Sequence, residues 1–300
     1  MDTITNVPDI GFIGFGEAAR AFVSGWRSAA DVPAGISVAA FDEKVLDPAL
    51  RSSITGPCED LAVECAAAPD AATRGRSVVF SLVTADRARD AAEEAARHIE
   101  PGTLFLDCNS CAPSTKQGNA ALIERAGGTY VDVAVMSPVH PARHKVPLLL
   151  SGAGAEAAAR ALSGLGMKGN VAGTEVGAAS ATKMLRSVMI KGFEALTAEC
   201  VLAARRAGVE DAVLASLQAS DPGFDWRARS AYNFERMMVH GTRRAAEMRE
   251  VAATLRDLGL PDRMTKAAAE WQDEVATLKV APGSDELAER ADRVIERLVR

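Results

Sequence analysis

The stretch Ile10-Gly11-Phe12-Ile13-Gly14-Phe15-Gly16-Glu17-Ala18-Ala19 decides the fold of this 300-residue chain. A short apolar run precedes the pattern Gly-x-Gly-x-x-Ala, and residues 18–29 then show helical spacing. Gly14 permits a tight turn, Gly16 has no side chain to block a pyrophosphate, and Ala19 lets the helix lie close to the strand. The pattern therefore predicts that the helix N-terminus binds a dinucleotide. The residues expected to contact it are Gly14, Phe15, Gly16, Glu17 and Ala18.

Apolar runs and helical segments alternate along the first half of the chain. The further runs are 36–42, 77–83, 103–107, 129–135 and 146–150, and the helical segments include 18–29, 86–98 and 114–126. Continuous apolar strands separated by helices indicate a mostly parallel sheet that is covered on both faces. We therefore expect an α/β domain of the Rossmann type, doubly wound, over residues 1–173.

The pattern changes after Gly173. Residues 177–208 contain no proline and have apolar residues at helical spacing, which predicts one helix of about 30 residues. Helices are expected to continue to the end, with breaks at Asp221-Pro222-Gly223, Gly259-Leu260-Pro261 and Pro282-Gly283. The second domain, 174–300, is thus predicted to be all-α and to include a long connecting helix.

Composition excludes several classes of protein. Hydrophobic residues make up 48% and charged residues 25% of the chain, and the net charge is −6. This balance argues against a nucleic-acid partner and against an anionic membrane, because both attract clustered Lys and Arg. The start, Met1–Asn6, lacks the features of a signal peptide, and no apolar run approaches the roughly 20 residues of a membrane helix. We therefore expect a cytoplasmic protein.

The cysteines and histidines give no sign of a metal or of a disulfide scaffold. Five cysteines in 300 residues are too few for such a scaffold. Cys108 and Cys111 form a Cys-x-x-Cys, for which reduced thiols at a strand end are the expected state. The four histidines show no ligand spacing with carboxylates, so no metal is expected.

The end of the second strand bears on the choice of dinucleotide. Asp42 lies 26 residues after Gly16, near the position where a carboxylate holds both ribose hydroxyls. Such a carboxylate would repel a 2′-phosphate, so NAD is the expected cofactor, while Lys44 leaves NADP as the alternative. Glu43 lies between them. A solvated acid at a strand end is the other interpretation of Asp42.

Two further strand ends are expected at the same edge of the sheet. The carboxyl ends of strands line the cofactor crevice in a doubly wound sheet. Leu82, Val83 and Thr84 are therefore expected beside the adenosine ribose and the pyrophosphate, and Asn109 and Ser110 nearer the nicotinamide.

The predicted long helix begins with small residues that precede Lys183. Small side chains let a bulky group approach, and the nicotinamide is the candidate. Lys183, Ser187 and Lys191 follow at spacings of four and share a face, which Arg186 borders. A solvated basic stripe is the alternative interpretation of this spacing.

Several motifs together resemble the β-hydroxyacid dehydrogenase superfamily, which includes hydroxyisobutyrate, tartronate-semialdehyde, threonate and 6-phosphogluconate dehydrogenases. They occur in order over nearly the whole chain: 11–16, 107–113, 131–135, and Gly177 followed six residues later by Lys183. The C-terminal part is similar to a less characterised branch of NAD(P)-dependent oxidoreductases. The resemblance implies that Lys183 takes the hydroxyl proton during oxidation and returns it during reduction. That role requires a lysine pKa below its ordinary value of about 10.4, which burial beside a cationic nicotinamide would cause.

The chain also departs from the superfamily pattern. Ser187 stands where Asn is usual, Asn109 replaces a serine, and Met136-Ser137-Pro138 replaces a Ser-Gly-Gly loop. A Lys-Asp pair of the C-terminal domain aligns with Ala246-Glu247, which leaves His240, Arg243 or Arg244 as stand-ins. The residues expected to contact substrate are Asn109, Ser110, Ser137, Pro138, His140, Arg186, Ser187 and His240.

These features predict an enzyme that transfers a hydride between a nicotinamide and a β-hydroxy acid or related small hydroxylated substrate. The alternatives are an imine reductase, which usually replaces the lysine, a dinucleotide-binding sensor without turnover, and a Cys108/Cys111 redox protein. The resemblance also implies a homodimer, since helical domains of this superfamily usually interlock between subunits. A long helix that one thin domain cannot bury on both faces favours the same arrangement.

Overall fold

The computed structural model describes residues 9–33 and 35–298, and its contacts divide the chain into two units, Met1–Lys183 and Met184–Arg300. The division lies ten residues beyond the expected boundary at 173. The reason is that helix α6 (Ala178–Arg206) begins in the first unit, where its first turns bond to the sheet. The segment Met1–Asn6, from which no leader is expected, lies outside the described residues.

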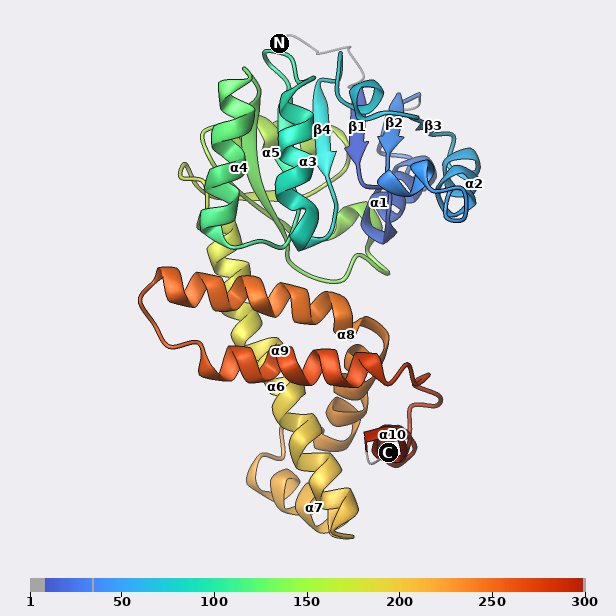
Figure 1. Ribbon diagram of the computed structural model, residues 1–300, viewed down its shortest axis with the longest axis vertical. Coiled ribbons are helices and arrows are strands. Elements are labelled where there is room, and N and C mark those ends of the chain that lie inside the picture. Colours follow the sequence, from blue (N-terminus) through green and yellow to red (C-terminus); the bar gives the residue numbers. More distant parts are fainter. Residues whose placement is uncertain (1–8, 34, 299–300) are drawn as a thin grey trace. The chain divides into compact units, whose positions relative to one another are not determined.

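An eight-stranded sheet forms the first unit, in the order β3-β2-β1-β4-β5-β6-β7-β8 (Figure 1). Its strands are β1 (Ile10–Ile13), β2 (Val38–Phe41), β3 (Glu64–Cys65), β4 (Val78–Ser81), β5 (Leu104–Asp107), β6 (Thr129–Val135), β7 (Leu148–Ser151) and β8 (Gly169–Gly173). Neighbours are parallel except β6 and β7, which are antiparallel. The predicted doubly wound, mostly parallel sheet is confirmed. The short β3 and the exposed edge strand β8 were not expected, because neither is an apolar run.

Helices cover both faces of this sheet, and each face has its own core. The helices are α1 (Glu17–Ser28), α2 (Ser52–Asp60), α3 (Ala88–Ala96), α4 (Pro113–Arg125) and α5 (Ala155–Gly164). Phe12 and Phe80 stack at 5.1 Å on one face, against Trp26 of α1. Phe105 and Tyr130 stack on the other face, where α3 and α4 lie side by side. Burial on both faces explains why these strands are continuous apolar runs.

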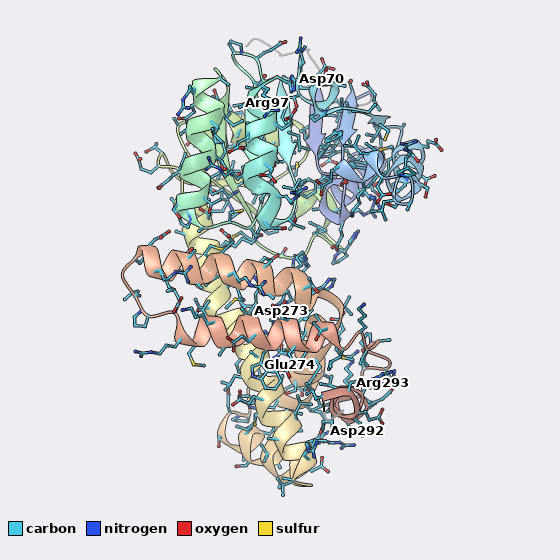
Figure 2. The ribbon with its side chains drawn as sticks, in the orientation of Figure 1. Asp70, Arg97, Asp273, Glu274, Asp292 and Arg293 are labelled. Atoms are coloured by element: carbon cyan, nitrogen blue, oxygen red, sulfur yellow. The ribbon has the colours of Figure 1, made fainter. Side chains whose placement is uncertain are left out.

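Only helices are described in the second unit. They are the greater part of α6, α7 (Glu210–Ser220), α8 (Trp226–Asp257), α9 (Arg263–Thr277) and α10 (Leu287–Leu298). The three predicted breaks fall between these helices, so the predicted all-α region is confirmed, as is the long helix predicted over 177–208; α8, with 32 residues, is a second long helix that was not predicted as one element. On α10, Leu287, Ala291 and Val294 are buried. Asp292 of the same helix, which is labelled in Figure 2, accepts hydrogen bonds from Arg205 of α6 at 2.7 and 2.5 Å.

Buried ion pairs join the helices of this unit. Lys191 of α6 donates to Glu247 of α8, and Arg244 of α8 donates to Glu194 of α6. All four side chains are buried. Lys191 therefore belongs to the interior of the second unit, which excludes the solvated basic stripe as an account of this residue. None of the helices that the structure describes is both long and apolar enough to cross a membrane.

A buried histidine joins α1 to the segment between β6 and β7. A Cβ on Gly25 of α1 would lie 2.0 Å from Nδ1 of His144, so only glycine admits the imidazole there. His144 is buried, and neither ring nitrogen has a hydrogen-bond partner among the described residues. Burial lowers the pKa of His144, as do the charges of Lys145 and Arg143, while Asp31 opposes them.

This burial predicts a loss of stability in mild acid. The folded pKa of His144 lies below that of an unfolded histidine, about 6.5. Stability is therefore complete above that pH and falls below it, because unfolding takes up a proton. Urea unfolding at pH 7.5 and 5.5 should show a smaller loss in His144→Leu than in the wild type. His140→Leu, at an exposed histidine, should keep the wild-type loss, and equal losses in all three proteins would contradict the assignment.

Candidate active site

The glycine turn after β1 is shaped for close approach of a ligand. Gly14 has φ +88°, and a Cβ there would lie 2.4 Å from the carbonyl oxygen of Leu82. At Gly16, by contrast, a Cβ would have no described atom within 4 Å. Gly16 is also the N-cap of α1 and makes no side-chain cap, so the first N–H groups of the helix are open to an anion. The turn therefore has the open geometry that a pyrophosphate cradle requires, and the binding of a pyrophosphate there stays a prediction.

Asp42 is fixed against this turn. One carboxylate oxygen accepts from the backbone N–H of Phe15 at 2.9 Å, and the other accepts from that of Lys44 at 3.1 Å. A carboxylate has about four acceptor sites, so the half-buried side chain of Asp42 can accept further hydrogen bonds. Glu43 pairs with Arg87 at 2.5 Å, and Lys44 is exposed. Asp42 thus holds the turn, which a simple solvated acid would not do.

The ends of β4 and β5 are joined by Asn109. Its Oδ1 accepts from the backbone N–H of Val83 at 2.7 Å, and its Nδ2 donates to Ser81 at 2.9 Å. The side chain is buried, so its amide holds the two strand ends in register. Leu82 and Val83 are half-buried and Thr84 is exposed, at the edge where the glycine turn lies.

Lys183 lies at this edge as well. Its Nζ donates to Oγ of Ser110 at 2.6 Å, although 73 residues separate the two in sequence. Both side chains are half-buried, so the amine is held against the strand end and is not directed into bulk solvent. The structure therefore brings together Lys183, Ser110, Asn109 and the residues of the glycine turn through a chain of direct contacts.

The two neighbouring cysteines are unsuited to redox chemistry. Burial raises the pKa of the Cys108 thiol to about 12, against the opposing charges of Lys116 and Lys183. Cys111 is fully buried and its Sγ lies 3.6 Å from the carbonyl oxygen of Ala85. Reactive cysteines are accessible and have a depressed pKa, so the geometry argues against the redox alternative.

Asp132, inside β6, fixes the start of the helix that carries Lys183. Its Oδ2 accepts from the backbone N–H groups of Gly177 and Ser180 at 3.2 and 2.9 Å, and from the hydroxyls of Ser180 and Ser151 at 2.9 and 3.1 Å. The Ser151 hydroxyl in turn accepts from the N–H of Ala179 at 3.0 Å. A negative charge at a helix N-terminus is favourable, and here it comes from the sheet.

A buried lysine balances the charge of Asp132 and of its neighbour in the sheet. Lys116 Nζ lies 3.5 Å from Asp132 and 2.9 Å from Asp107, and all three side chains have no exposed surface. Burial alone would lower the pKa of Lys116, but the charges of Asp107 and Asp132 raise it above its ordinary value. Tyr130 donates to Asp107 at 2.6 Å, and burial raises the pKa of its hydroxyl.

The sequence patterns predict no role for this cluster. Asp107 and Asp132 lie within motifs of the resemblance, and Lys116 lies in none of these motifs. The sequence does contain a signal for it: Asp107 ends one apolar run and Asp132 lies inside another. Because a buried charge requires a partner, two such acids indicate a buried basic side chain nearby.

The remaining residues that were predicted to contact substrate are divided between the two units. Ser137, Pro138 and His140 are exposed in the segment between β6 and β7. Arg186, Ser187 and His240 belong to the second unit, where Ser187 is buried, Arg186 is exposed and His240 is half-buried. Within residues 9–33 and 35–298, no group of three acidic, cysteine or histidine side chains could hold a metal ion.

Comparison with solved structures finds the same fold over nearly the whole chain. A conserved hypothetical protein of Sinorhizobium meliloti is 36% identical, with 98% of this chain and 97% of that chain covered and a TM-score of 0.73. A conserved protein of unknown function, described as structurally similar to 3-hydroxyacid dehydrogenases, is 32% identical over 90% of this chain and 98% of its own, with a TM-score of 0.67.

Enzymes of known activity share the fold at lower identity. The 3-hydroxyisobutyrate dehydrogenase of Mycobacterium tuberculosis, solved with L-serine, is 17% identical over 96% of this chain and 99% of its own, with a TM-score of 0.70. A reductive aminase of Aspergillus terreus is 16% identical over the same shares, with a TM-score of 0.55. At these identities the likeness shows the fold alone.

Two family models match the sequence directly. A domain of unknown function, DUF1932, matches residues 204–275. The model described as the NAD binding domain of 6-phosphogluconate dehydrogenase matches residues 9–175, which is more than half of the chain. The resemblance stated from the motifs is thereby confirmed, and the chain belongs to the family that carries the NAD binding domain of 6-phosphogluconate dehydrogenase.

Proposed function

We propose that this protein is an NAD(P)-dependent dehydrogenase that acts on a β-hydroxy acid or a related small hydroxylated substrate, with Lys183 as the general acid and base. The observation that carries the proposal is the position of the Lys183 amine, 2.6 Å from Ser110 Oγ. Ser110 follows β5 at the edge of the sheet where Asn109 contacts Val83, and where Leu82 meets the glycine turn. An amine and a dinucleotide cradle at one edge suit proton transfer coupled to hydride transfer.

The residues around the glycine turn fit the cofactor that the family match indicates, a nicotinamide dinucleotide. The open Gly16 and the uncapped N-terminus of α1 would hold the pyrophosphate. Asp42 would accept from ribose hydroxyls, which favours NAD over NADP. When bound, the nicotinamide supplies or accepts the hydride.

Lys183 would manage the proton that accompanies this hydride. In reduction, the protonated amine donates to the carbonyl oxygen of the substrate, and in oxidation the neutral amine takes the hydroxyl proton. Ser110 accepts a hydrogen bond from Nζ and so limits the positions of the amine. Asp132 holds the helix one turn earlier, which makes it a positioning residue for Lys183.

The substrate class is supported by the 32% identical structure that is described as similar to 3-hydroxyacid dehydrogenases. The likeness to the reductive aminase is to a fold shared at 16% identity, and the lysine, which imine reductases usually replace, argues against that activity. A sensor without turnover would not need an amine held at the strand end.

Removing the amine tests the enzymatic assignment. Lys183→Ala should lower the rate of nicotinamide reduction by at least about a hundredfold, the size of a lost acid–base contribution, while the Kd for NAD changes little. Absorbance of the reduced nicotinamide would be followed on a panel of β-hydroxy acids and small alcohols. Lys168→Ala, at an exposed lysine, is the matched control. Binding of NAD without turnover of any panel member would support the sensor, and turnover of cyclic imines only would support an imine reductase.

Removing the Asp132 carboxylate at the start of α6 tests the positioning of Lys183. Asp132→Ala leaves a buried lysine with one carboxylate and frees the N–H groups of Gly177 and Ser180. The free energy of unfolding should fall by about 3–5 kcal/mol, and turnover should fall more than NAD affinity. Urea unfolding and initial rates would be compared with those of Asp60→Ala, at an exposed acid. Equal stability of the two variants would refute this role.

Cofactor choice tests the role of Asp42. Its charge should make NAD bind at least about tenfold more tightly than NADP, because like charges at close range repel. Asp42→Asn keeps an acceptor for Phe15 and removes the charge, so the ratio of the two Kd values should fall toward one. Calorimetry with both dinucleotides measures this ratio, and an unchanged ratio in the variant would show that another group selects the cofactor.

A further inference from the structure

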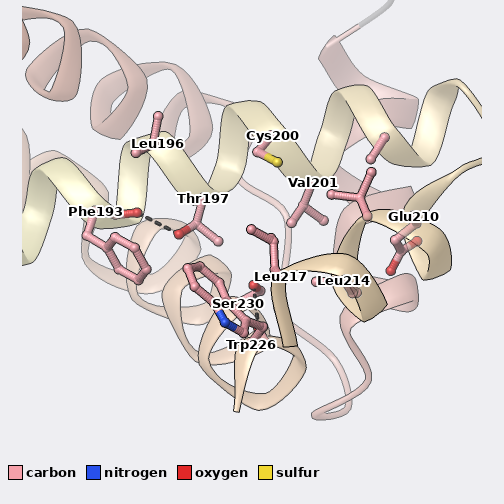
Figure 3. A pocket seen from close by; sticks show the side chains of 12 residues that line it. Phe193, Leu196, Thr197, Cys200, Val201, Glu210, Leu214, Leu217, Trp226 and Ser230 are labelled. Atoms are coloured by element: carbon pink, nitrogen blue, oxygen red, sulfur yellow. Dashed lines mark hydrogen bonds between the residues drawn. The ribbon is translucent and has the colours of Figure 1, made fainter. Parts of the chain in front are cut away.

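An elongated cavity lies within the second unit, between α6, α7 and the start of α8 (Figure 3). Its volume is about 280 Å³. The α6 residues of its wall extend from Phe193 to Ala204, which is a distance of about 16 Å along the helix. A cavity of this volume and length is narrow, so it fits an extended chain better than a bulky ring.

Most of the wall is apolar. Leu196 comes from α6, Leu214 and Leu217 come from α7, and at one end Phe193 packs against Trp226 with ring centroids 5.9 Å apart. Such a wall favours aliphatic groups, because contact removes apolar surface from water on both sides. An apolar cavity of about 150 Å³ holds the six carbons of benzene, so this one has room for roughly eight to twelve carbons.

The two hydroxyl groups in the wall already use their protons within the unit. Thr197 donates to the carbonyl oxygen of Phe193 at 2.6 Å and accepts from Asn233 at 3.1 Å. Ser230 donates to the carbonyl oxygen of Trp226 at 2.6 Å. Neither hydroxyl therefore requires a polar group of a ligand in the middle of the cavity.

Glu210 differs from the rest of the wall, and it lies at the end away from Phe193 (Figure 3). Its side chain is only 7% exposed. Oε2 accepts from Arg205 at 2.8 Å, but Oε1 has no hydrogen-bond partner among the described residues. A nitrogen of Arg227 lies 3.9 Å from Oε1, too far for a hydrogen bond. Because an unsatisfied buried acceptor is costly, a donor on a ligand would stabilise this oxygen.

The cavity also has a way in from solvent. Leu196 and Cys200 both belong to its wall, yet Leu196 is 55% exposed and Cys200 is exposed as well. A ligand can therefore enter beside α6, and the Cys200 thiol can report on whether the entrance is covered.

We propose that this cavity binds an uncharged aliphatic alcohol of about eight to twelve carbons, whose hydroxyl donates to Oε1 of Glu210. The chain lies along α6, and its far end meets Phe193 and Trp226. A fatty-acid carboxylate is disfavoured, because it has no proton to donate at neutral pH and Glu210 repels it. The site lies wholly in the second unit and does not depend on the proposed enzymatic function.

Calorimetry on the full-length protein at pH 7.5 tests the class of ligand. The Kd of 1-octanol should be at least about tenfold lower than that of 1-hexanol, because each buried methylene lowers Kd about threefold to fourfold. Cyclooctanol, with the same number of carbons, should bind at least about fivefold more weakly, since a bulky ring overpacks a narrow cavity. Octanoate should bind at least about tenfold more weakly because of its charge. No saturable binding of 1-octanol, or equal Kd values across the series, would overturn the proposal.

Two variants test the location and the hydrogen bond. Ala204→Leu places a larger side chain in the cavity and should raise the Kd of 1-octanol at least about tenfold. Ala203→Leu, at an exposed position of the same helix, is the matched control and should bind as the wild type does. Glu210→Gln keeps the size of the side chain, and its amide can also donate to a carboxylate. The preference for 1-octanol over octanoate should therefore fall toward one. An unchanged Kd in Ala204→Leu, or an unchanged preference in folded Glu210→Gln, would refute the site.

Alkylation of Cys200 tests the location without any substitution. At 1-octanol concentrations tenfold above its Kd, the rate of reaction with N-ethylmaleimide should fall by about tenfold, because few cavities remain empty. Peptide mass spectrometry would follow Cys200, and Cys65, a half-buried thiol of the first unit, should keep its rate. A Cys200 rate that 1-octanol leaves unchanged would show that the alcohol does not occupy this cavity.

Discussion

Asp132 places a full negative charge in the middle of a strand with no exposed surface, and much of the first unit is arranged to hold that charge. Its carboxylate accepts from two backbone N–H groups at the start of α6 and from two hydroxyls, while Lys116 supplies a positive charge that it shares with Asp107. Burying charges is costly unless each is paired and hydrogen-bonded. The direct partners of this β6 carboxylate come from β7, α4 and the start of α6, and Lys116 also pairs with Asp107 of β5, so the cluster links five elements.

The candidate active site depends on this constraint. Lys183 lies one turn beyond Ser180, so its position follows from the bonds that anchor the helix start. Ser110 lies three residues beyond Asp107, so its position follows from the same buried cluster. The donor Lys183 and the acceptor Ser110 thus come from two segments that are both fixed by the buried cluster of Asp107, Lys116 and Asp132. A preorganised pair of this kind needs little rearrangement when a substrate arrives.

Much of this could be predicted from the sequence, because the signals were local. The central strands are buried on both faces, so their sequences are continuous apolar runs. The glycine pattern is equally local, because the turn after β1 requires a positive φ at Gly14. The edge strand β8 is Gly-Asn-Val-Ala-Gly and mostly exposed, so it has no such signature. The antiparallel pairing of β6 and β7 depends on non-local contacts that no local pattern encodes.

In the candidate site, too, the features with a local sequence signal could be predicted and those that depend on non-local contacts could not. Lys183 could be found from its motif, and its contact with Ser110 was expected only as proximity to one cofactor. The anchoring by Asp132 could not be inferred, because it joins residues 45 and 48 positions apart. The spacing of eight residues places Lys191 on the same helix face as Lys183. In the structure, however, Lys191 is buried and pairs with Glu247, which is 56 residues away in sequence.

The reversed strand β7 has a consequence for the direction of the polypeptide. In an all-parallel sheet, the helix after the last strand starts at the carboxyl edge and travels back along the sheet. Here β7 and β8 carry the chain backward first. Helix α6 therefore starts level with Asp132 and advances toward the carboxyl edge, where Lys183 meets Ser110. Because β7 is antiparallel to β6, α6 runs toward the carboxyl edge of the sheet and not away from it. A helix thus places the Lys183 amine at an edge that is otherwise formed by loops.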